Sequence, residues 1–113
     1  MKESEIKIKI SLDDNKVPEQ IHWTAEDAGE LDKKSEAVLI SLWDAEQQNS
    51  LRIDLWTKDM KVDEMKTFFH QTLTAMSETF ERATGDEKMA SDMRRFCQYF
   101  AEELNLIKDV DKK

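Results

Sequence analysis

Residues 51–73, LRIDLWTKDMKVDEMKTFFHQTL, contain a change in the spacing of apolar residues that decides the fold. Leu51, Ile53 and Leu55 alternate with polar residues, which is the period of a half-buried β-strand. From Val62 onward, apolar residues recur every three or four positions, which is the period of an amphipathic helix. The stretch therefore predicts a strand, a tight polar turn and a long helix.

Three more strands are expected before this stretch, at residues 5–12, 17–24 and 35–44, because each alternates between apolar and polar residues. Pro18 cannot donate a backbone hydrogen bond, so it belongs at a strand start or a sheet edge. If Trp43 lies opposite Ser50, then three apolar pairs share one face of a hairpin. These pairs are Leu42 with Leu51, Ile40 with Ile53 and Val38 with Leu55. A register that aligns the apolar residues in this way is the expected one.

Two amphipathic helices are expected after the strands. The first has an apolar stripe and an opposite polar face that includes His70 and Ser77. The stripe consists of Met65, Phe69, Leu73, Met76, Phe80 and Ala83, widened by Phe68. Gly85 suits the left-handed end of this helix, and Asp86 can cap a second helix at residues 87–106. The apolar face of the second helix includes Phe96, Cys97 and Phe100.

The order of these elements predicts an α+β fold. We expect a four-stranded antiparallel meander followed by two long amphipathic helices packed on one face (ββββαα). The 113 residues are expected to form one domain, with the sheet in residues 1–57 and the helical layer in 58–107. Residues 108–113 form a charged tail that is expected to fray.

The composition argues against several classes of partner. The net charge is −8, whereas nucleic acids and anionic membranes attract clusters of Lys and Arg. No apolar run approaches the roughly 20 residues that cross a bilayer, so no direct membrane insertion is expected. A single cysteine, Cys97, excludes an intramolecular disulfide, and the first residues lack the apolar segment of a signal peptide. A cytoplasmic location is therefore expected.

The sequence contains no recognisable catalytic or metal-binding motif. His22 and His70 have no partners at metal-ligand spacing, and both are expected to be solvated. Cys97 lies on an apolar helix face without a histidine that could activate it, so an inert buried thiol is expected. We therefore expect no enzymatic activity, no cofactor and no metal.

The second face of the sheet is a candidate protein-contact site. It carries Leu39, Trp43 and Trp56 among polar residues, and exposed apolar patches of this kind mark interfaces. Two covers for it are possible: residues 25–34, which form a polar loop or a short helix, or another chain. We expect a second copy, in a two-fold homodimer that pairs through this face, because two-fold dimers are the commonest soluble oligomers.

Several stretches resemble the gliding motility-associated protein GldC family of Bacteroidetes. They are residues 53–60 (IDLWTKDM), 62–66 (VDEMK), 68–73 (FFHQTL), 83–89 (ATGDEKM) and 96–100 (FCQYF). The resemblance covers nearly the whole chain and is less well defined before residue 17. Lys61 departs from the family, in which a proline is expected there.

The resemblance implies a small, non-enzymatic accessory protein that supports surface gliding through protein partners of the gliding machinery. It implies no role for any individual residue. An alternative comes from topology, because four antiparallel strands followed by two helices on an acidic chain are similar to the export chaperone SecB. That alternative is a holdase or export-assisting protein-binding module, and it rests on analogy of fold.

Overall fold

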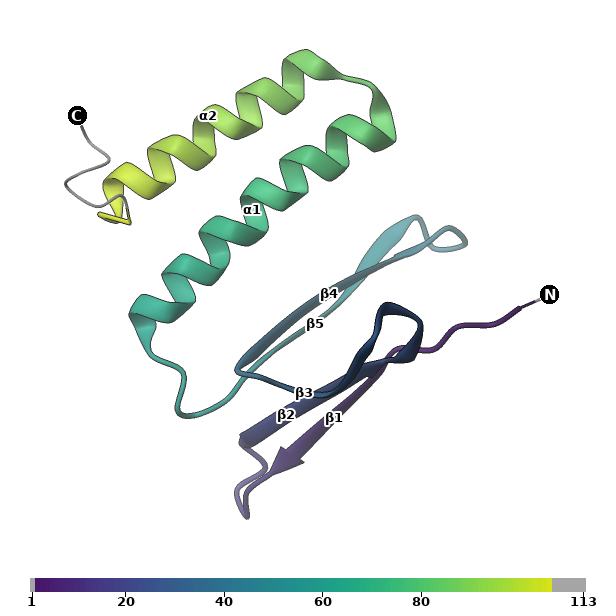
Figure 1. The fold of residues 1–113 in the computed structure, drawn as a ribbon. Helices are drawn as coiled ribbons and strands as arrows, with labels where there is room; N and C mark the ends of the chain where they lie inside the picture. The colour runs from purple at the N-terminus through teal and green to yellow at the C-terminus, as the bar shows by residue number, and fades with distance from the viewer. Residues whose placement is uncertain (1, 107–113) are drawn as a thin grey trace. The chain divides into compact units, whose positions relative to one another are not determined.

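The computed structural model describes residues 2–106, which form five strands, one 3₁₀ turn and two helices. Figure 1 labels the strands and the helices. The strands are β1 (Lys7–Leu12), β2 (Pro18–Ala25), β3 (Glu30–Ser35), β4 (Ala37–Asp44) and β5 (Asn49–Trp56). The 3₁₀ turn η1 (Glu26–Ala28) lies between β2 and β3, and the helices are α1 (Val62–Thr84) and α2 (Glu87–Glu103). The predicted α+β class, with two helices after the strands, is confirmed.

The predicted four-stranded meander is wrong. The strands form two sheets, a three-stranded sheet in the order β1-β2-β3 and a two-stranded sheet of β4 and β5. The difference arises in residues 25–34, which were expected to form a polar loop or a short helix. Gly29, in the left-handed conformation with φ of 77°, reverses the chain after η1, and Glu30–Ser35 then pairs with β2. Because β3 takes this place beside β2, β4 pairs within the described residues only with β5.

The first sheet is a regular hairpin to which a less regular third strand is added. Ile8 lies opposite Trp23, and Ile10 lies opposite Ile21, which is fully buried. Pro18 begins β2, as predicted, and the pairing with β1 becomes irregular beside it. The pairing of β2 with β3 is also irregular at its far end, where Asp32 has a φ of 47°.

The second sheet has the predicted register. Leu42 faces Leu51, Ile40 faces Ile53 and Val38 faces Leu55, and Trp43 lies opposite Ser50. The hairpin closes through Asp44, whose side chain accepts hydrogen bonds from the backbone N–H groups of Glu46 and Gln47, at 3.0 and 3.2 Å. Gln48 completes the turn in the left-handed conformation, with φ of 54°.

The segment after β5 is bonded to both sheets. Thr57 is 1% exposed; its N–H donates to the backbone carbonyl of Glu36 at 2.8 Å and its Oγ1 to the Glu36 carboxylate at 2.6 Å. The next residue, Lys58, donates its N–H to the carbonyl of Pro18 at 3.1 Å. Its ammonium lies 3.1 Å from a carboxylate oxygen of Asp13 and 3.1 Å from one of Glu19. These bonds tie β2 and the first turn to the end of the second sheet.

The helical ends follow the sequence signals. The Glu64 side chain accepts a hydrogen bond from the N–H of Lys61 at 3.1 Å, which satisfies a backbone donor at the start of α1. Gly85 adopts φ of 74° and donates its N–H to the carbonyl of Glu81 at 2.8 Å, which ends α1 as predicted. Asp86 caps α2 by accepting from the N–H of Met89 at 2.9 Å.

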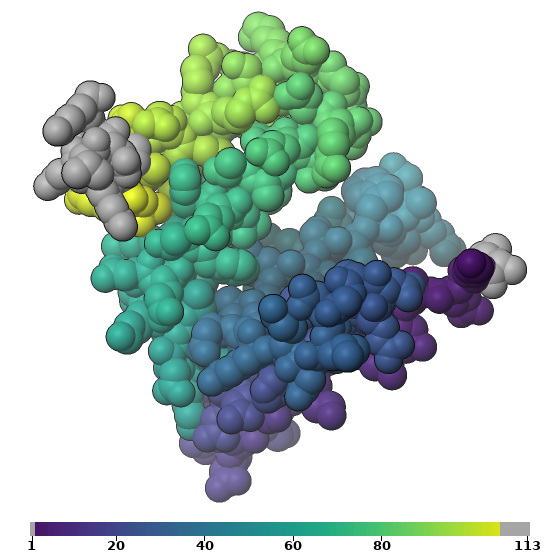
Figure 2. Space-filling model, in the orientation of Figure 1, coloured from purple at the N-terminus to yellow at the C-terminus, as the bar shows by residue number. Residues whose placement is uncertain are grey.

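The two helices lie side by side as a hairpin (Figure 1), and their side chains are in contact in the space-filling view (Figure 2). Small side chains fill the contact: Ser77 of α1 and Ala90, Cys97 and Ala101 of α2 are all buried. An ion pair of 3.0 Å joins Arg94 to Glu81 at one end. Small residues allow two helix backbones to approach closely, which explains why Ser77 occupies this contact.

This helix–helix contact uses the face of α1 that was expected to be polar. His70 lies on that face and stacks on Phe100 of α2, with ring centroids 6.3 Å apart, so this residue is partly buried and not fully solvated. Phe69 and Met76 of the predicted apolar stripe are 41% and 52% exposed. In the described residues, neither helix is long and apolar enough to cross a membrane.

Contacts divide the chain into two compact units, Met1–Met60 and Lys61–Lys113. The first contains both sheets and the second contains the helical hairpin. The single domain and the packing of the helices on one sheet face stay predictions. The expected frayed tail, residues 108–113, lies outside the described residues.

Candidate protein-contact face

The candidate site is one face of the hairpin formed by β4 and β5. Strand alternation places Ala37, Leu39, Ser41 and Trp43 of β4 on this face, together with Ser50, Arg52, Asp54 and Trp56 of β5. The three predicted contact residues, Leu39, Trp43 and Trp56, therefore do share a face. We call this surface the tryptophan face. Its role as a protein contact is a prediction that the geometry alone does not test.

Both tryptophans are open to solvent. Trp43 is 63% exposed and Trp56 is 54% exposed, while Leu39 is partly buried. Residues 25–34, which were one possible cover, are instead engaged mainly in η1 and β3. Large exposed aromatic side chains are enriched at the energetic centres of interfaces. The tryptophan face thus has the composition of a binding surface.

The two tryptophans lie at opposite ends of the tryptophan face. Trp56 pairs with Ala37, which is six residues from Trp43 along β4, so they are about 20 Å apart at the usual rise of a strand. Arg52 and Asp54 occupy the centre, with their charged atoms 3.7 Å apart. The face therefore consists of two apolar ends and a charged middle.

The opposite face of the same hairpin is apolar except for Asp44 and Asn49 beside the turn. The register of its apolar residues was predicted correctly, but these residues were expected to belong to the core. Leu42, Leu51 and Ile53 are 57%, 53% and 48% exposed. An isolated two-stranded sheet is only marginally stable in water. The tryptophan face also carries large apolar residues, so the second sheet presents apolar side chains on both of its faces.

The junction at Lys58 perturbs two ionisable groups. Backbone hydrogen bonding lowers the pKa of Asp13 below its usual value of 3.8, chiefly through the N–H of Val17, and Lys58 contributes to the same shift. The pKa of Lys58 is raised above its usual 10.5, first by the hydrogen bond to Glu19 and then by the one to Asp13. Both groups are held in their charged forms, which fits a structural ion-pair network.

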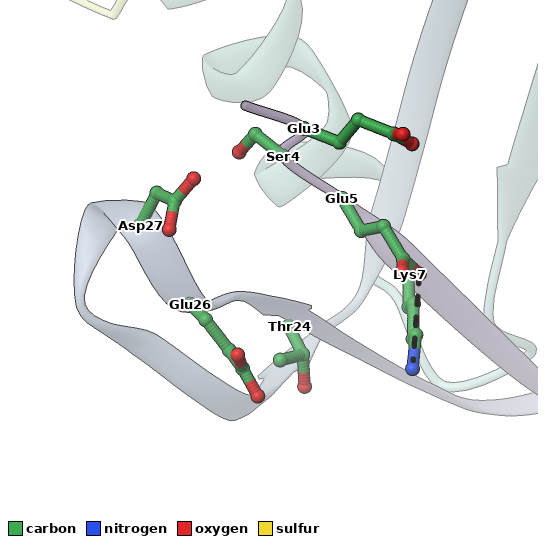
Figure 3. Close-up of a pocket in the computed structure, with 7 residues that line it drawn as sticks. All are labelled: Glu3, Ser4, Glu5, Lys7, Thr24, Glu26 and Asp27. Atoms are coloured by element: carbon green, nitrogen blue, oxygen red, sulfur yellow. Dashed lines mark ion pairs between the residues drawn. The ribbon is translucent and has the colours of Figure 1, made fainter. Parts of the chain in front are cut away.

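A shallow pocket of about 150 Å³ lies beside the start of β1 (Figure 3). It is lined by Glu3, Ser4, Glu5, Lys7, Thr24, Glu26 and Asp27. Lys7 pairs with Glu5 at 3.8 Å, as the dashed line in Figure 3 marks. Sites for small molecules typically measure about 300–1,000 Å³ and are mostly apolar. This pocket is smaller and acidic, so it does not resemble a substrate or cofactor site.

The remaining candidate residues do not converge on a reaction centre. His22 lies across from Lys9 and Lys34 in the first sheet, and His70 stacks on Phe100. Cys97 is buried between the helices at 5% exposure. Within residues 2–106, no cluster of three or more His, Cys, Asp or Glu side chains is arranged to hold a metal ion.

One of three comparisons with known proteins gives a match. No curated protein and no solved structure matches the chain significantly. A family model described as "Gliding motility-associated protein GldC-like" matches residues 18–106. The match begins at the start of β2 and includes β3, the second sheet and both helices, whereas β1 lies outside it. Because it covers most of the 113 residues, the chain belongs to the GldC-like family of gliding motility-associated proteins.

Proposed function

We propose that this protein is a non-enzymatic accessory protein that supports gliding motility by binding a protein of the gliding machinery through the tryptophan face. The family supports the link to motility. The observation that carries the contact is the exposure of Trp43 and Trp56, at 63% and 54%, on one face of a hairpin. Burying one large aromatic side chain in an interface contributes up to several kcal/mol.

The layout of the tryptophan face indicates what kind of partner it binds. A partner must contact two apolar ends about 20 Å apart and satisfy Arg52 and Asp54 between them. A folded surface or an extended segment with complementary charges meets these requirements. The face-to-face homodimer expected from the sequence would occupy the same surface, so a second copy and a motility partner would compete for it.

Complementation in a gliding bacterium tests this proposal. The gene is deleted, and plasmids supply the wild type, Trp43→Glu or Trp56→Glu. We expect both variants to accumulate normally and to fail to restore spreading on agar. Tyr99→Glu is the matched control, because Tyr99 is an aromatic residue of α2 with similar exposure, 57%. Full spreading with both tryptophan variants would refute the role of the face, and full spreading of the deletion strain would refute the role in gliding.

The SecB-like alternative predicts different partners. Its basis was a four-stranded sheet followed by two helices, whereas residues 2–106 contain five strands in two sheets. The exposed apolar face of Leu42, Leu51 and Ile53 is the feature that favours client binding. A pulldown from native cells separates the two functions. One stoichiometric motility protein supports the accessory role, and many unfolded clients support the holdase.

A cytoplasmic location is part of the proposal. The single cysteine supports it, because one cysteine cannot form the intramolecular disulfides that are typical of proteins in oxidising compartments. Fractionation of native cells with an antibody against the chain tests it. Recovery in the periplasmic or outer-membrane fraction would contradict it.

A further inference from the structure

The outer edge of β5 is an unpaired strand edge. In the described part of the chain, β5 pairs with β4 alone, and every β5 residue except Leu55 is exposed. Exposed edges of this kind offer a row of free backbone N–H and C=O groups, and they readily accept another strand.

The backbone pattern shows which residues of β5 point outward. Thr57 donates its N–H to the carbonyl of Glu36, so the backbone groups of Thr57 point toward the β4 side. Inward and outward groups alternate along an antiparallel strand. The same direction therefore applies to Leu55 and Ile53, whereas the N–H and C=O groups of Arg52 and Asp54 point to the free edge.

The sequence of β5 is self-complementary around Ile53. In an antiparallel pairing with a two-fold axis at this residue, Arg52 lies opposite Asp54 of the second copy, and Asp54 lies opposite Arg52. Leu51 lies opposite Leu55 on the other face, and Ile53 meets itself. In this one register, opposite charges face each other, apolar residues face each other, and the outward backbone groups of the two strands are aligned for hydrogen bonding. Opposite charges at directly paired positions stabilise a sheet, whereas like charges destabilise it.

We propose that two copies of this chain pair edge to edge through β5, with the two-fold axis at Ile53, to form one continuous four-stranded sheet in the order β4-β5-β5-β4. Arg52 and Asp54 are available for this pairing, since their side chains are 70% and 41% exposed. Within one copy they lie 3.7 Å apart. In the pair, each also gains an opposite charge across the strand boundary, and the backbone groups of both residues gain partners.

The other strand edges are less suited to self-pairing. Two copies of β1 aligned around Ile8 would place Lys7 opposite Lys9, which repel. The edge of β3 is interrupted at Asp32, whose φ of 47° departs from a regular strand. The outer edge of β4 carries no charge between Ala37 and Trp43, so nothing there sets a register. Among the strands of residues 2–106, β5 alone combines a regular edge with complementary charges.

Edge pairing would extend both faces of the second sheet. Trp56 of one copy and Trp43 of the other would lie in the same cross-strand row, because Ser50 pairs with Trp43 and would face Trp56 of the other copy. The tryptophan faces would join into a single surface that stays free. This inference does not rest on the role in gliding, and its test needs only purified protein.

Charge reversal tests the pairing by sedimentation equilibrium from low to high micromolar concentration. Wild type should form a dimer of twice the 13.3 kDa chain mass. Arg52→Asp or Asp54→Arg alone makes the facing charges alike, so each should raise the dissociation constant on the order of tenfold or more. An equimolar mixture of the two variants restores opposite charges at both positions. The mixture should therefore dimerise about as tightly as the wild type.

Arg95→Asp is the matched control. It changes the net charge by the same amount as Arg52→Asp. The Arg95 side chain lies on α2, is 76% exposed and pairs with Asp92 of the same helix. The dissociation constant of the Arg95→Asp dimer should therefore equal that of wild type. Far-ultraviolet circular dichroism verifies that each variant is folded. A monomeric wild type at high micromolar concentration would overturn the proposal. Single variants that dimerise like wild type, or a mixture that stays monomeric, would do so as well.

Discussion

Thr57 is the residue whose replacement most directly probes how the end of the second sheet is held, because it bonds Glu36 just before β4. The change is Thr57→Val, which keeps the shape of the side chain and removes the hydroxyl. That hydroxyl lies in a residue that is 1% exposed and donates to the Glu36 carboxylate at 2.6 Å. A hydrogen bond to a charged group contributes about 1.5–3 kcal/mol. Because Glu36 is only partly buried, water can replace part of this bond, and the lower end of the range applies.

We therefore expect Thr57→Val to lower the free energy of unfolding by about 1.5 kcal/mol. Urea denaturation at fixed protein concentration measures it, as a lower midpoint with an unchanged slope. The control is Thr67→Val, since Thr67 is exposed and its hydroxyl donates only to a backbone carbonyl of its own helix, at 3.3 Å. That change should stay within about 0.5 kcal/mol. An effect of Thr57→Val no larger than that of the control would refute the importance of this bond.

Three further predictions follow from particular residues. Gly85→Ala should destabilise the helical hairpin by about 1–2 kcal/mol, because Gly85 adopts φ of 74°; an unchanged urea midpoint would contradict this. The folded-state pKa of Asp13 is lowered, so the stability from its carboxylate is present above pH 3.8 and is lost as the pH falls below that value. Asp13→Asn should flatten this acid dependence, and a wild-type acid profile in that variant would exclude Asp13 as its source. Cys97 is 5% exposed, so a thiol reagent should label it much more slowly in native protein than in urea, and equal rates would contradict burial between the helices.

The features that sequence could predict are those set by short-range patterns. The register of β4 and β5 follows from two strands whose apolar residues match at one alignment only. The ends of the helices follow from Gly85 and Asp86, whose conformational and capping preferences act locally. The tryptophan face follows from the same alternation.

The features that sequence missed depend on distant contacts. Glu30–Ser35 has only one large apolar residue, Leu31, which is 65% exposed, so no apolar face marks β3 as a strand. Its place is set by backbone pairing with β2. The contact between the helices was not predicted, because the prediction followed the large apolar residues of the first helix. Close approach of two helix backbones instead favours small residues such as Ser77 and Ala90.

The sequence of β5 contains a second pattern, in its charges, that the alternation of apolar residues does not reveal. In the order Leu51, Arg52, Ile53, Asp54, Leu55, the two outer positions are the same apolar residue, and the two positions beside the centre carry opposite charges. That symmetry is visible in the sequence, but its meaning depends on knowing that β5 lies at an edge.

The most direct test of the proposed function is site-specific photocrosslinking in living, gliding cells followed by mass spectrometry. A photoreactive residue replaces Ser41, which lies on the tryptophan face beside Arg52 and is exposed. A second strain carries it at Arg95 on α2 as the control. The account predicts a crosslink to one motility protein from position 41 and none from position 95. Crosslinks from position 41 to many unrelated proteins, or to none, would contradict it.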